Sequence, residues 1–138
     1  VFPQPVGNTW IWFNVSKPPF DNKKVRQAVA YAINKEEMIR AALWGLGETV
    51  NNQPFLKRSR MYIPVKDREV DLAKAKQLLA EAGYPNGFKT EFLGPSGFTP
   101  DVDGAEAVMG QLQKIGVEST LKIIDRAAWM KSMRESPA

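Results

Sequence analysis

The feature that most restricts the fold is a strand–helix–strand pattern between residues 88 and 124. Residues 88–93 alternate between apolar and polar side chains, which predicts a half-buried strand. Residues 100–115 carry apolar side chains at helical spacing after an initial Pro, and Gly116 ends this helix. Residues 117–124 then predict another strand. Because helical crossovers join parallel strands, we expect an α/β or α+β fold, with a small mixed sheet, a parallel β-α-β unit and flanking helices.

Further helices are predicted N-terminal to this unit. The first spans residues 22–33, with Asp21 as its N-cap. A second starts after Asn34, where Glu37 three residues later completes a pattern like a capping box. A third covers residues 71–82 and has one apolar face. We expect these helices to pack against the sheet.

An aromatic and β-branched segment near the N-terminus, residues 9–15, predicts a strand with both faces covered. Trp10 and Trp12 lie in it, and Trp44 and Trp129 lie elsewhere. We expect the tryptophans to belong to the core, apart from Trp129, which follows a strand in the first turn of a helix and can face a cleft. If this strand is left uncovered, its edge and apolar faces recruit partners, which predicts a dimer of the isolated chain.

The absence of two residue types narrows the chemistry. The 138 residues include no Cys and no His, which excludes thiolate metal sites and the usual nucleophile–histidine arrangements. We therefore expect no metal, no cofactor and no enzyme activity, with carboxylate-based catalysis as a minor alternative. A net charge of +4 leaves a basic nucleic-acid-binding module as the other alternative. We interpret the densest basic stretch, residues 57–60, as a solvated loop instead of a phosphate-binding patch.

Three blocks of sequence, taken in order, resemble the peptide- and nickel-type solute-binding proteins of ABC importers. The match extends from about Thr9 to Arg134. The blocks are Phe13-Asn14 with Pro19-Phe20-Asp21, Val25-Arg26-Gln27-Ala28 and Tyr31-Ala32-Ile33-Asn34-Lys35, then residues 73–85 with Gly87-Phe88, and finally Gln111-Leu112-Gln113-Lys114-Ile115-Gly116-Val117.

The resemblance implies a two-lobed binding protein that closes on its ligand by hinge motion. Residues 1–138 would form one domain, an excised part of the second lobe. No basic start with an apolar stretch follows Val1, so we expect a processed or excised piece of a longer protein. The implied function is capture of a peptide or similar small solute for ABC permease subunits, in the periplasm or another extracytoplasmic space, with a membrane anchor as an option.

The resemblance also implies which residues of this chain face the ligand. Trp129 matches a pocket aromatic of peptide binders. Asn51, Asn52 and Gln53 lie in a long loop between residues 46 and 70, and loops of this length in compact domains are usually functional or linkers. We expect these four residues to be the ligand-binding residues of this chain.

Overall fold

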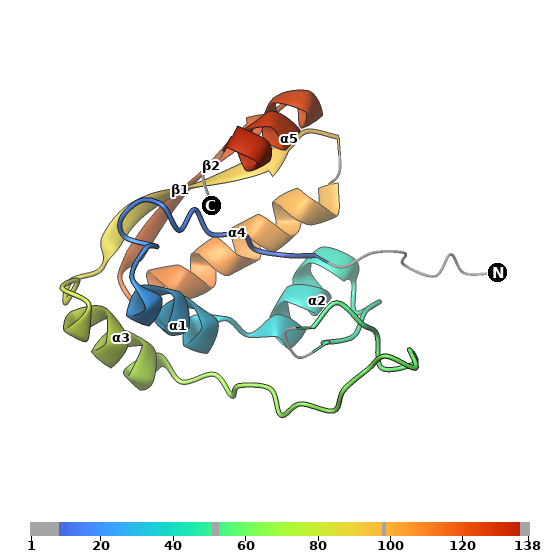
Figure 1. Cartoon of the computed structure of the whole chain (residues 1–138), viewed down its shortest axis with the longest axis horizontal. Helices are drawn as coiled ribbons and strands as arrows, with labels where there is room; N and C mark the ends of the chain where they lie inside the picture. Colours follow the sequence, from blue (N-terminus) through green and yellow to red (C-terminus); the bar gives the residue numbers. More distant parts are fainter. Residues whose placement is uncertain (1–8, 51–52, 98, 136–138) are drawn as a thin grey trace.

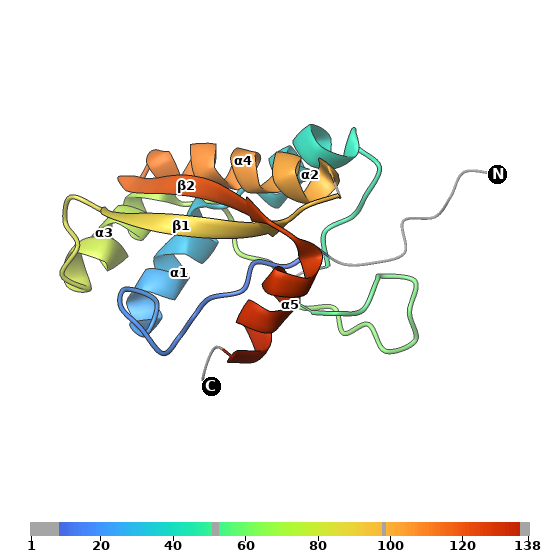
Figure 2. The ribbon, with the colours of Figure 1, turned by 90° about the horizontal axis from the view of Figure 1, so that it is seen from above.

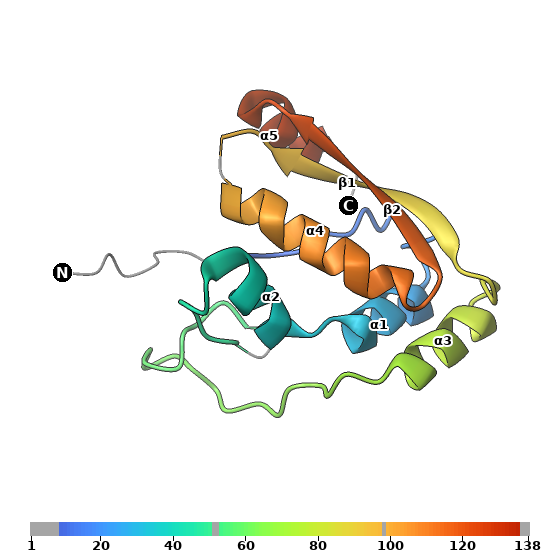
Figure 3. The same ribbon diagram turned by 180° about the vertical axis from the view of Figure 1, so that it is seen from behind.

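The computed structural model describes residues 9–50, 53–97 and 99–135 (Figure 1). The long loop runs along one side of the molecule between the second and third helices (Figure 3). Within these residues the elements, in order, are α1 (Lys23–Ala32), α2 (Lys35–Leu43), α3 (Leu72–Glu81), β1 (Phe88–Pro95), α4 (Thr99–Gln113), β2 (Val117–Ile124) and α5 (Arg126–Glu135).

The predicted β-α-β unit is confirmed. Strands β1 and β2 pair in parallel, in a register that joins Phe88 to Val117 and Pro95 to Ile124. Helix α4 connects them and packs on both, while α5 contacts β1. Figures 1 and 2 both place α5 on the side of the strands away from α4. The small sheet thus lies between the helices, in agreement with the expected fold class.

The hydrophobic core lies where α1, α3 and α4 meet the sheet. Each of these helices contributes the apolar face that its sequence period predicts. Leu79, Leu112 and Val117 are each at most 1% exposed. Burial of such side chains stabilises by roughly 1.5–3 kcal/mol each. The remaining members are Val25, Ala28, Val29, Ala32, Ala75, Leu78, Val108 and Ile115.

The helix caps differ from the prediction at two positions. Asn22, not Asp21, caps α1, because its side chain accepts a hydrogen bond from the backbone N–H of Lys24 at 2.9 Å. Asn34 caps α2 as predicted, by accepting from the Glu37 N–H at 3.0 Å. The reciprocal half of the capping box is absent, because the Asn34 N–H donates to Gln111 instead. A residue 77 positions away therefore completes this helix start.

The strand expected at residues 9–15 is wrong. The backbone of residues 9–14 is irregular and enters no ladder within the described part of the chain. Ile11 and Phe13 pack against the core, whereas Trp10 and Trp12 are 43% and 69% exposed. A segment with strand propensity needs a neighbouring edge to complete its hydrogen bonds, and here β1 and β2 pair with each other.

The expectation that Trp44 belongs to the core is also wrong. Its side chain is 76% exposed. The residue ends α2 in the left-handed conformation, with φ of 48°, and its N–H bonds to the Ile39 carbonyl. Helix termination therefore turns this side chain outward.

Candidate functional site

The carboxyl ends of β1 and β2 lie beside the start of α5. Ligands of open parallel sheets bind beyond this end of the strands. The Ser96 N–H donates to the Ile124 carbonyl at 2.8 Å, which continues the strand pairing past β1. Asp125 follows β2 and caps α5 by accepting from the Ala128 N–H at 2.9 Å. This cap fixes the first turn of α5, in which Trp129 stands.

Trp129 is half-buried and its one polar side-chain group is already used. The indole Nε1–H donates to the Leu93 carbonyl at 3.3 Å, which holds the ring against the end of β1. Around it the surface is apolar, since Leu93, Met130 and Met133 are 42%, 37% and 38% exposed. The group that Trp129 can offer to a ligand is therefore its aromatic ring, by stacking or apolar contact.

Gln53 occupies a structural position in the loop. Its Nε2–H donates to the Ile63 carbonyl at 2.7 Å, and its Oε1 accepts from the Ile63 N–H at 3.1 Å. The side chain therefore imitates a strand partner and closes residues 53–63 into a loop. The other two predicted loop residues, Asn51 and Asn52, lie outside the described residues.

The structure does not bring the two parts of the predicted site together. Figures 1 and 3 show α5 on one side of the molecule and residues 53–63 on the other. A ligand that contacts Trp129 would therefore meet this chain mainly through α5 and the strand ends. The remaining contacts would come from elsewhere.

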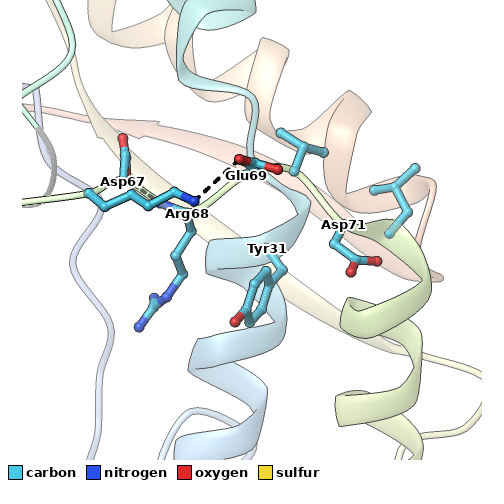
Figure 4. Close-up of a pocket in the computed structure, with 8 residues that line it drawn as sticks. Tyr31, Asp67, Arg68, Glu69 and Asp71 are labelled. Carbon is cyan, nitrogen blue, oxygen red and sulfur yellow. Dashed lines mark hydrogen bonds and ion pairs between the residues drawn. The ribbon is translucent and has the colours of Figure 1, made fainter.

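A second hollow was not anticipated from the sequence. It is an open cavity of about 480 Å³ between Tyr31 on α1 and residues 66–72 (Figure 4). Lys35 bonds both carboxylate oxygens of Asp67, at 2.8 and 2.7 Å, and the Arg68 guanidinium lies 5.6 Å from the centre of the Tyr31 ring. Acidic and basic side chains alternate along this segment, so no periodic pattern marked it. These contacts fix the approach to α3 and leave no single charge in excess.

The described residues show no catalytic or metal-binding arrangement. Among them, no group of three or more acidic side chains could hold a metal ion. A hydrogen bond from Lys24 lowers the pKa of Glu81, whose carboxylate lies 3.0 Å from the Lys24 ammonium. This pair joins α1 to α3 on the surface and lies in the helical layer. In the same part of the chain, no helix is long and apolar enough to cross a membrane.

Solved structures with this arrangement are periplasmic binding proteins. One is the ABC transporter-associated periplasmic binding protein DppA from Helicobacter pylori, in complex with the peptide STSA. It superimposes with a TM-score of 0.78 at 37% sequence identity, over 88% of this chain and 23% of that one. The class that the fold defines is therefore a periplasmic-binding-protein-like α/β unit.

The sequence comparison gives the family. Residues 2–136 match the middle part of the bacterial extracellular solute-binding proteins, family 5, and the chain belongs to this family. It is 41% identical to heme-binding protein A of Haemophilus influenzae, over 91% of this chain and 24% of that protein. It is 36% identical to the glutathione-binding protein GsiB of Pectobacterium atrosepticum, over 84% and 22%. The chain thus spans about a quarter of the length of these relatives.

Proposed function

We propose that this chain is the inner part of the second lobe of a two-lobed solute-binding protein. The whole protein captures a peptide or similar small solute outside the cytoplasm and delivers it to ABC permease subunits, without catalysing a reaction. The proposal is supported by the family match and by the names of relatives that bind heme, glutathione or a peptide. Neither the nucleic-acid-binding nor the carboxylate-enzyme alternative has such support.

The observation that carries a ligand-binding role within this chain is the placement of Trp129. Its indole N–H is committed to Leu93, while its ring lies among exposed apolar side chains at the carboxyl end of the sheet. A ring fixed in this way loses little conformational entropy when a ligand stacks on it. Trp129 therefore contributes an apolar platform, and the polar contacts of the ligand come from other parts of the whole protein. Asn51, Asn52 and Gln53 remain part of the proposed site, with Gln53 acting mainly through the loop shape.

The test is Trp129→Ala in the whole protein that contains this chain, titrated by calorimetry with heme, glutathione and the peptide STSA. We expect the affinity for whichever ligand binds to fall about 10- to 100-fold, since loss of an aromatic contact costs roughly 1.5–3 kcal/mol. Trp129→Phe keeps a ring and should retain most of the affinity. A purely core role for Trp129 predicts instead a loss of roughly 3–5 kcal/mol in unfolding free energy with unchanged affinity.

We also propose that the isolated 138-residue chain self-associates through its N-terminal aromatic segment. Trp12 is 69% exposed and Trp10 43% exposed on a backbone with no ladder partner among the described residues. The charge of +4 opposes association weakly, because salt screens it over about 8 Å. Light scattering at high micromolar concentration should show a dimer that Trp12→Ser weakens. Trp44→Ser, which removes a comparably exposed ring elsewhere, is the control, and a monomeric chain would contradict this proposal.

A further inference from the structure

Residues 53–63 form a preorganised loop, here called the Gln53 loop. The two hydrogen bonds between the Gln53 side chain and the Ile63 backbone close it. Inside it, the Ser59 N–H donates to the Leu56 carbonyl at 2.8 Å, and the Tyr62 N–H donates to the Ser59 carbonyl at 3.1 Å. Leu56 is partly buried and forms part of the base of the loop. The tip therefore holds a defined shape that projects from the body of the molecule (Figure 2).

The tip of the Gln53 loop carries charge of one sign. Lys57, Arg58 and Arg60 are exposed, and no acidic residue occurs from residue 53 to residue 66. The acidic residue that contacts this loop is Glu48, whose carboxylate accepts the backbone N–H of Lys57 at 3.3 Å. Unlike the cavity beside Tyr31, where acids and bases alternate, this surface has an excess of cations.

An apolar side chain stands directly beside these cations. Met61 is 62% exposed, and its backbone N–H donates to the Ser59 hydroxyl at 3.2 Å. Ile63, at the base, is 66% exposed. Burying three cations under the rest of a longer protein would cost several kcal/mol for each ion without a partner. The tip is therefore a surface of the whole protein, and its partner must accept both positive charge and an apolar side chain.

From this combination we infer that the Gln53 loop binds the anionic surface of a lipid membrane. Lys57, Arg58 and Arg60 lie among the phosphates, and Met61 enters the boundary between headgroups and acyl chains. An acidic protein surface would be satisfied by the cations alone and would not require exposed Met61. The inference does not depend on the identity of the transported solute.

The experiment is cosedimentation of the full 138-residue chain with vesicles of phosphatidylcholine, with and without about one-third phosphatidylglycerol. Binding is expected to the anionic vesicles only and should be lost in about 0.5 M salt. The double variant Lys57→Glu/Arg60→Glu should lower the partition coefficient at least about 30-fold, because each cation near such a surface contributes about fivefold. Met61→Ser should lower it further without changing the charge.

The matched control is Lys23→Glu/Lys76→Glu. These exposed lysines on α1 and α3 change the charge by the same amount at the opposite end of the molecule (Figure 1). The control should retain most of the vesicle binding. An equal loss in the control, or no binding of the parent chain to anionic vesicles, overturns the inference. Binding that Met61→Ser leaves unchanged points to an acidic protein surface and also overturns it.

Discussion

Replacing Gly87 with Ala should lower the free energy of unfolding by roughly 2–5 kcal/mol. A Cβ at this position would lie 1.8 Å from the Gly116 carbonyl oxygen, which is backbone and cannot rotate away. Gly87 also has φ of 78°, in the left-handed region. The conformation costs a side chain about 1–2 kcal/mol and the overpacking about 1–3 kcal/mol. Since a domain of this size has roughly 5–15 kcal/mol in total, the loss is a large fraction.

The control for this prediction is Gly83→Ala. Gly83 has φ of 92°, and a Cβ there would meet nothing within 4 Å. Only the conformational cost of about 1–2 kcal/mol should remain. Urea denaturation of both variants separates the two effects. Equal losses would mean that the crossing of Gly87 over Gly116 relaxes at little cost.

This contact shows which part of the fold depends on long-range geometry. Gly87 and Gly116 directly precede β1 and β2, and Phe88 pairs with Val117. The sequence predicts both strands from their alternation and both glycines as breakers. It does not predict that the two glycine backbones touch, because positions 87 and 116 are joined only by the parallel pairing. Local patterns therefore define the elements, and contacts between distant residues define the register.

The N-terminal segment shows the opposite limit. Its β-branched and aromatic residues predict a strand, yet strand formation requires an edge to pair with, and the described residues provide none for residues 9–14. In contrast, the helices were predicted correctly because their hydrogen bonds lie within the segment itself.

The candidate site follows the same division. Placement of Trp129 at the end of the sheet could be predicted, because Asp125 caps α5 directly after β2. The bond from its indole N–H to Leu93 could not, since it joins residues 36 positions apart. Nor could the double bond between Gln53 and Ile63, which depends on the path of the loop. Sequence thus locates the aromatic residue, and the structure shows which of its groups remain available.

Gln111→Leu should be the second strongly destabilising change. The Gln111 side chain is 4% exposed, and its Oε1 accepts from the Asn34 N–H at 2.8 Å. Its Nε2 donates to the Asn34 carbonyl and to Glu37 Oε2, each at 3.2 Å. Leucine would leave both Asn34 backbone groups without these partners, at about 1–3 kcal/mol each. We expect a loss of roughly 2–4 kcal/mol in unfolding free energy, measured by urea denaturation.

Gln111→Glu gives this contact a pH dependence that a packing defect would not show. The new carboxyl can still accept from the Asn34 N–H, but its ionised form faces the Asn34 carbonyl and the Glu37 carboxylate. Both raise its pKa in the folded state above the unfolded value, so the ionised form destabilises the fold. Stability should therefore be lower at pH 7 and recover as the pH falls through the raised pKa. Gln113→Glu, at an exposed position of α4, should show no such recovery, and equal pH profiles for the two variants would contradict a role of Gln111 as donor.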